Sequence, residues 1–373
     1  MRHHIRMLNN VQILRAIAAY LVVLNHAFTN FYKYSYSDSY SYSDIIDTRI
    51  FGAGVDIFFV ISGFIMVYIS ARCPQSTGMF WKNRIIRIVP LYWLATFVTL
   101  ASAILGSALL GVQSSGLRDW DFGDLVASLL MVPDIRADGA TWPILPVGWT
   151  LVYEAFFYFL FGLTLLLCDL RRAVLLLTGT MLSLVVIGAF LTDVPFAIFT
   201  YTRPIILEFC IGAIFGILYT QADTFKLSRP VMTASALLAV AVPAMIIGDQ
   251  VHPVSELTDA SRFFILGLPS AMIVASTLIL EQSGIVSRNR FLLLQGNASY
   301  SIYLFHLLVL AIFYIVVAKL VPLHSLPVAL AVMISSIIAC GIGGTLIHLL
   351  IEKPLHDFFR ARRVNAPMPA QMA

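Results

Sequence analysis

Residues 11–26 read VQILRAIAAYLVVLNH, an apolar run that is interrupted by an arginine at position 15 and ends on a histidine at position 26. The apolar character continues to about residue 30, which is long enough for a helix that crosses a bilayer. Because eleven residues make about three helical turns, Arg15 and His26 leave the same helix face roughly 16 Å apart. Ionisable side chains are costly in hydrocarbon and usually have a function there, so Arg15 and His26 are our first candidate site residues.

The whole chain has the composition of a membrane protein. Its 373 residues are 59% hydrophobic and 12% charged, and the mean hydropathy is +0.87. Soluble domains carry about twice that share of charged residues. We therefore predict an all-α polytopic membrane protein with a lipid bilayer around it and no nucleic-acid partner. The expected transmembrane helices, about ten in number, lie at about 11–30, 51–70, 88–108, 147–167, 173–191, 203–220, 231–248, 262–280, 300–318 and 328–350.

The distribution of positive charge predicts how the chain is oriented. The N-terminal segment MRHHIR is basic, which is typical of a cytoplasmic end. With ten spans, sixteen of the 24 lysines and arginines fall on the N-terminal side of the membrane, seven fall on the opposite side and Arg15 lies within it. Both termini are therefore expected to be cytoplasmic. Residues 1–357 should form a single transmembrane domain, and residues 358–373 a basic, then Pro/Ala-rich, disordered tail.

Three carboxylates are expected at the same membrane depth as His26. A rise of about 1.5 Å per residue places His26, Asp56, Glu154 and Glu208 in the outer part of the bilayer, on four different helices. A carboxylate beside a histidine fixes its tautomer and raises its basicity. Such a histidine can remove a proton from an attacking hydroxyl group. The sequence therefore predicts His26 as a general base, with Asp56 or Glu154 as its partner.

Cations gather at the other membrane surface. Arg84 and Arg87 are three residues apart, on one helix face and on the same side of the membrane as Arg15. Paired guanidinium groups bind phosphates through two parallel hydrogen bonds. The alternative interpretation is positive-inside topology with contacts to lipid head groups.

Aromatic residues are expected at the outer surface. Trp149 stands where it could stack on a sugar or anchor its helix at the interface. The tyrosine- and serine-rich stretch at 31–43 has the same two interpretations. The histidines, cysteines and acids show no metal-ligand spacing, so we predict no metal.

These residues belong to a set of motifs that resembles the acyltransferase 3 family of integral membrane proteins, and in particular its exopolysaccharide-modifying members. The most specific motif is an arginine followed, after ten residues, by a histidine on the first span. The resemblance runs from about residue 10 to residue 354. The further matching segments are GVDIFFVISGF at 54–64, RIIR at 84–87, GWTLVYEAFFY at 148–158, ASYSIYLFH at 298–306 and EKP at 352–354.

The resemblance implies transfer of an acyl group, most often acetyl, from cytoplasmic acyl-CoA to a sugar hydroxyl outside the cytoplasm. A bacterial inner membrane, a polysaccharide or lipid-linked sugar acceptor, and possible polysaccharide assembly proteins go with that activity. We expect acyl-CoA to contact Arg15, Arg84 and Arg87.

Several further roles remain predictions. Tyr303 and His306 are expected to line the acyl-CoA path or to make structural hydrogen bonds. Trp149, Tyr153 and Glu208 are expected near the sugar. The oxyanion donor could be a backbone N–H, Asn25 or Tyr153.

Two other function classes fit part of the pattern. A polysaccharide or proton-coupled transporter would also hold buried ionisable groups, but no internal repeat is visible here. A non-catalytic scaffold in a polysaccharide assembly complex leaves the cost of burying Arg15 and His26 unexplained.

Overall fold

The computed structural model describes residues 7–34, 49–110, 120–135, 141–221, 229–251, 259–321 and 325–364. Most of the tyrosine- and serine-rich stretch and the basic N-terminal segment lie outside the described residues, as does the chain after residue 364.

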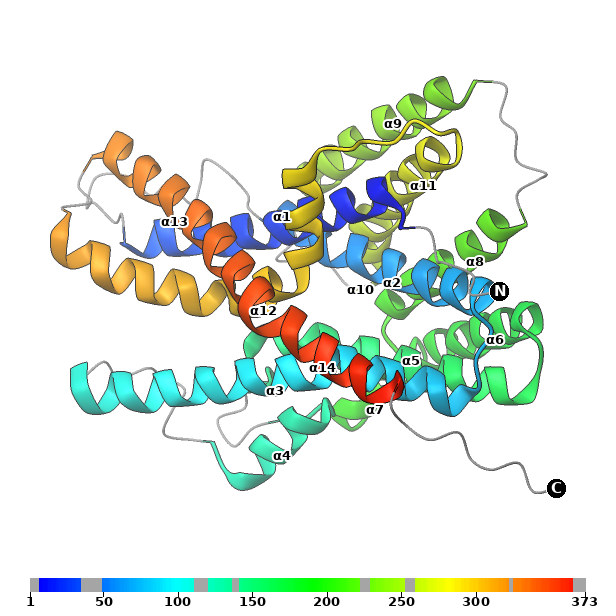
Figure 1. The fold of residues 1–373 in the computed structure, drawn as a ribbon, viewed down its shortest axis with the longest axis horizontal. Helices are drawn as coiled ribbons and strands as arrows, with labels where there is room; N and C mark the ends of the chain where they lie inside the picture. Colours follow the sequence, from blue (N-terminus) through cyan, green and yellow to red (C-terminus); the bar gives the residue numbers. More distant parts are fainter. Residues whose placement is uncertain are drawn as a thin grey trace.

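Every regular element in the described ranges is a helix (Figure 1). The short helical turns are η2 (Arg49–Gly52), η3 (Pro146–Gly148), η4 (Pro204–Ile206), η7 (Phe263–Gly267) and η8 (His348–Glu352). The α-helices are α1 (Asn9–Tyr34), α2 (Ala53–Arg72), α3 (Thr77–Leu110), α4 (Phe122–Leu130), α5 (Trp149–Leu167), α6 (Leu170–Gly188), α7 (Phe196–Tyr201), α8 (Leu207–Thr220), α9 (Pro230–Val251), α10 (Asp259–Arg262), α11 (Leu268–Gln282), α12 (Arg290–Leu320), α13 (Leu326–Ile347) and α14 (Lys353–Val364).

The apolar helices agree with the spans expected from hydropathy. In the described residues, 8 helical segments are long and apolar enough to cross a membrane. Two shorter apolar helices, Pro204–Thr220 and Pro230–Ile246, fall at the other two expected spans. The all-α polytopic fold is therefore confirmed. One boundary was wrong, because α14 remains helical as far as Val364 where a disordered tail was expected from residue 358.

Helices α2 and α8 pack with their backbones almost in contact. A Cβ atom added at Gly63 would lie 2.0 Å from the Phe209 carbonyl oxygen, and one at Gly212 would lie 1.9 Å from the Val60 oxygen. Gly216 faces Val67 in the same way. Small residues at such interfaces let membrane helices approach closely, so this packing fixes the position of α2.

Helix α1 lies in the middle of the bundle and contacts α2, α11, α12 and α13 (Figure 1). At its start, Gly296 of α12 lies against the Gln12 backbone, where a Cβ atom would be 2.1 Å from the carbonyl oxygen. Helix α12 then bends and runs alongside α1 (Figure 1). This pairing brings residues that are almost 300 positions apart into one site.

Helix α3 is attached to α5 by a tryptophan. Trp81 donates its indole N–H to the Tyr158 carbonyl at 3.1 Å, and its ring occupies the space above Gly162. Because Arg84 and Arg87 follow on the next turn of α3, this attachment holds both cations beside α5.

Candidate active site

Two histidines meet between α1 and α12. The distance from His306 Nε2 to His26 Nδ1 is 3.1 Å, and the ring centroids are 4.9 Å apart. Nδ1 of His26 also lies 2.9 Å from the Val22 carbonyl oxygen. On the far side of the pair, Nδ1 of His306 lies 2.7 Å from the Tyr303 carbonyl oxygen. Each ring is therefore held by the backbone of its own helix and by the other ring.

These contacts assign the tautomers of the neutral pair. A carbonyl oxygen can only accept, so His306 carries its proton on Nδ1 and donates it to Tyr303. His306 Nε2 then has the lone pair and accepts from Nδ1–H of His26, which also points at Val22. The remaining nitrogen of His26, Nε2, consequently holds a lone pair. A neutral imidazole with a free Nε2 lone pair can act as a general base.

A cavity of about 680 Å³ approaches this pair from the Arg15 end of α1. Phe58, Thr150 and Tyr303 line it, and the rings of Phe58 and Tyr303 meet edge to face at 5.9 Å. The Tyr303 hydroxyl lies 2.8 Å from Thr150 Oγ1 and donates to the Val147 carbonyl at 3.1 Å. Tyr303 is thus between the cavity and His306, whose ring it contacts with centroids 6.0 Å apart.

The same cavity is cationic at its other end. Arg15, Arg84 and Arg87 all line it, and Arg15 donates to Gln12 Oε1 at 3.0 Å. Arg84 stands over the Tyr158 ring at 6.0 Å, and its buried Nε has no hydrogen-bond partner in the described protein. An unpaired buried guanidinium nitrogen favours an acceptor supplied by a ligand.

A second cavity of about 220 Å³ lies beside this end. It shares Arg15, Arg87 and His356 with the larger cavity and adds Lys353 from α14. Two acids, Glu352 and Asp357, also line it, and one oxygen of Glu352 accepts from Ser301 at 2.6 Å. Cations from three helices therefore surround the junction of the two cavities, an arrangement that suits a ligand with several phosphates.

The structure separates the carboxylates that were expected around His26. Glu154 accepts from Ser62 at 2.8 Å and from the Tyr158 hydroxyl, and it lines the large cavity. No carboxylate hydrogen-bonds His26 in the described part of the chain, where His306 is its side-chain partner. The expected carboxylate–histidine pair is therefore replaced by a histidine pair.

Asp56 is paired with an arginine. Arg262 donates to both oxygens of Asp56 at 2.8 Å, and Asp56 is fully buried. Glu208 is also fully buried, and neither of its oxygens has a hydrogen-bond partner among the described residues. A Cβ atom at Gly267 would lie 2.7 Å from Glu208 Oε1, so this carboxyl group packs against the backbone of η7. This cluster joins α2, α8, α10 and η7, and none of its members contacts the His26 ring.

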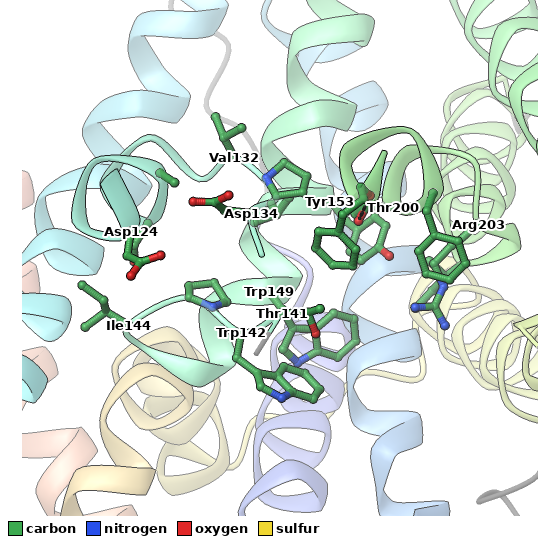
Figure 2. A pocket seen from close by; sticks show the side chains of 18 of the residues that line it. Asp124, Val132, Asp134, Thr141, Trp142, Ile144, Trp149, Tyr153, Thr200 and Arg203 are labelled. Atoms are coloured by element: carbon green, nitrogen blue, oxygen red, sulfur yellow. Dashed lines mark hydrogen bonds between the residues drawn. The ribbon is translucent and has the colours of Figure 1, made fainter. Parts of the chain in front are cut away.

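A separate pocket of about 430 Å³ contains the two aromatic residues that were expected near a sugar. We call it the aromatic pocket, and its walls include Asp134, Trp142, Trp149, Tyr153 and Arg203. In Figure 2, Asp124 and Asp134 lie at one end of the pocket and Arg203 at the other, with the aromatic rings between them.

Counting residues from the membrane surface gave the wrong depth for His306. The expected span began near residue 300, which would leave His306 close to the Arg15 end. Helix α12 instead begins at Arg290 and bends before it runs beside α1, so that His306 reaches His26 (Figure 1). Hydropathy contains no signal for this bend. The Asp56–Arg262 pair was also missed, since sequence gives depth but not which helices are neighbours.

Comparison with known proteins agrees with this architecture. Residues 8–344 match the acyltransferase domain family named Acyl_transf_3, and the chain belongs to that family. It is thus a multi-pass membrane acyltransferase by class. The chain is also 35% identical, over 329 residues, to the exopolysaccharide production protein ExoZ of Rhizobium meliloti (strain 1021). That alignment covers 86% of this chain and 94% of the relative. No solved structure matches the chain.

Proposed function

We propose that the protein transfers an acyl group, most simply acetyl, from acyl-CoA to a sugar hydroxyl of an extracytoplasmic polysaccharide or its lipid-linked precursor. The observation that carries this proposal is the cavity with cations at one end and Tyr303, next to the histidine pair, at the other. Family membership and the likeness to an exopolysaccharide production protein support the same reaction class.

The donor enters from the cationic end. Arg15, Arg84 and Arg87 bind the phosphates of acyl-CoA, and the unpaired Arg84 Nε supplies one donor. The pantetheine arm follows the cavity between α2, α5 and α12 towards Tyr303. The edge contact between Phe58 and Tyr303 lies where the thioester would pass on its way to His26.

The reaction uses His26 Nε2 as the base. The sugar hydroxyl gives its proton to Nε2 while its oxygen attacks the thioester carbonyl. The tetrahedral intermediate then breaks its C–S bond and releases the CoA thiolate, which takes the proton from His26. Because His306 and Val22 hold Nδ1–H, the lone pair is kept on Nε2. The competing route is an acyl-histidine intermediate formed on the same nitrogen.

The orientation follows the charge distribution. The Arg15 end faces the cytoplasm of a bacterium, where acyl-CoA is made, and the His26 end faces outward across the inner membrane. Both termini are then cytoplasmic. Asp56 and Arg262 join the outer ends of α2 and α10, which is a structural contribution to the site.

Mass spectrometry of the surface polysaccharide tests this function. A strain that lacks the gene should lose one acyl substituent, the wild-type gene should restore it and His26→Ala should not. An unchanged polysaccharide in the strain without the gene contradicts the proposal. Appearance of the substituent at the normal level with His26→Ala removes His26 as the base.

A further inference from the structure

The aromatic pocket lies on one face of α5, and the cavity of about 680 Å³ that we assign to acyl-CoA lies on the opposite face. We call the latter the acyl-CoA cavity. Trp149, Val152 and Tyr153 face the aromatic pocket, whereas Thr150 and Glu154 face the acyl-CoA cavity. One helix therefore forms the wall between two separate binding spaces. A donor and an acceptor can therefore occupy the two spaces at the same time.

The pocket is assembled from segments that are far apart in the chain. Its walls come from α4, from residues 132–134 and 141–144, from the start of α5, from α7 with Arg203 and Ile205, and from Arg262 at the end of α10. In the ten-span topology the connections among these segments lie on the outer side. The pocket therefore opens where a polysaccharide would be found.

Two hydrogen bonds to α3 hold the α4 wall in place. The Tyr92 hydroxyl donates to the Ser128 carbonyl at 2.9 Å, and the Trp93 indole donates to the Leu129 carbonyl at 2.9 Å. Directly after α4, Met131 adopts a left-handed backbone with φ of 55°. Residues other than glycine seldom adopt this conformation, and it turns residues 132–134 into the pocket wall.

The lining has the chemistry of a carbohydrate site. Trp142 is 52% exposed, and its indole meets that of Trp149 edge to face at 6.3 Å. Exposed indole faces cover the C–H faces of a sugar ring, and their N–H groups can donate to its oxygens. Asp134 at one end can accept from sugar hydroxyls, and Arg203 at the other can donate to ring or hydroxyl oxygens. A volume of about 430 Å³ is in the range of small-molecule sites.

We propose that the aromatic pocket binds one pyranose unit of the acceptor glycan, different from the unit that is acylated. This inference rests on the proposed acyltransferase function. The residues that line the aromatic pocket on α5 face away from the donor cavity, so we place the acylated hydroxyl on a neighbouring unit and not on the sugar held in the pocket. Binding instead positions the neighbouring unit, whose hydroxyl reaches His26. The pocket therefore makes the enzyme prefer oligosaccharides to single sugars.

The test uses purified full-length protein in lipid nanodiscs, with an oligosaccharide repeat of the host's own exopolysaccharide and acetyl-CoA as substrates. The variants are Trp142→Ala and Asp134→Asn, and Phe190→Ala is the matched control because Phe190 is 84% exposed outside both cavities. Trp142→Ala should raise KM for the oligosaccharide roughly tenfold or more, the loss typical of one important aromatic contact. Its KM for acetyl-CoA should not change.

Direct binding separates this inference from the proposed function. Isothermal titration calorimetry should show that wild-type protein binds the oligosaccharide and that Trp142→Ala binds it at least tenfold more weakly. An unchanged KM and an unchanged affinity in Trp142→Ala overturn the pocket assignment even if acyl transfer is normal. Wild-type protein that binds the oligosaccharide but transfers no acetyl group overturns the proposed function and leaves the pocket assignment standing.

Discussion

Replacing His306 by asparagine or by glutamine separates its two hydrogen bonds. The asparagine amide falls near the position of Nδ1 and can keep the bond to Tyr303, but it leaves His26 without its ring partner. The glutamine amide falls near the position of Nε2 and can accept from His26 Nδ1–H. Both replacements are polar and similar in size, so a difference between them reports on the contact with His26.

The magnitude follows from the two acceptors that share Nδ1–H of His26, at 2.9 and 3.1 Å. His306→Asn removes one acceptor and leaves Val22. One such hydrogen bond contributes about 0.5–1.5 kcal/mol, which corresponds to a fall in kcat of roughly 2–12-fold. His306→Gln should stay within about threefold of wild type, because it keeps an acceptor. His26→Ala removes the base and should lower kcat by about 10²–10⁴-fold.

The assay is steady-state transfer of labelled acetyl groups to oligosaccharide by protein in nanodiscs. KM for acetyl-CoA should be unchanged in both His306 variants, because His306 does not line the cavity in the described structure. Equal kcat values for His306→Asn and wild type would refute the tautomer argument. A rise in KM for acetyl-CoA with kcat unchanged would show that His306 contacts the donor instead.

Three further outcomes follow from other contacts. Arg84→Gln should raise KM for acetyl-CoA about tenfold with little change in kcat, as saturation kinetics will show. Asp56→Asn removes the buried carboxylate that accepts both hydrogen bonds from the partly exposed Arg262, so it should destabilise the protein by about 1.5–3 kcal/mol and lower the melting temperature in detergent. Gly212→Ala has no space against α2 and should lower the melting temperature and the yield of folded protein.

The arginine and glycine variants each have a control in the same chain. Arg171→Gln removes an exposed arginine outside the cavities and should leave KM for acetyl-CoA unchanged. Gly179→Ala adds a methyl group inside α6 where no atom lies within 4 Å, so its melting temperature should not fall below that of wild type. If Asp56→Asn has the melting temperature of wild type, the Asp56–Arg262 pair does not stabilise the fold. If Gly212→Ala has that same melting temperature, the close packing of α2 and α8 is not required. Arg84→Gln with an unchanged KM excludes Arg84 from the donor site.

The transmembrane architecture could be predicted from hydropathy because a bilayer demands long apolar helices whose backbone groups are satisfied internally. The same argument found Arg15, His26, Arg84 and Arg87, since charges in or next to hydrocarbon are conspicuous. The structure brings the three arginines to one cavity, as expected.

Lateral neighbours could not be predicted. The depth of His26, Asp56 and Glu154 was taken from residue counts, but the partner of each depends on which helices pack side by side. Glycines such as Gly63 and Gly296 decide that packing through close backbone contacts, and their effect is visible only in three dimensions. The histidine pair and the Asp56–Arg262 pair therefore emerged only from the structure.

The most direct measurement is acetyl transfer in sealed vesicles that contain purified protein, with labelled acetyl-CoA supplied only to the surface nearer Arg15 and oligosaccharide only to the other surface. Wild-type protein should place label on the oligosaccharide. His26→Ala should bind acetyl-CoA normally but should transfer label at a rate at least about 10²-fold lower. Equal label with His26→Ala, or transfer only when acetyl-CoA is supplied at the opposite surface, would contradict the assignment of a donor end and a catalytic end to α1.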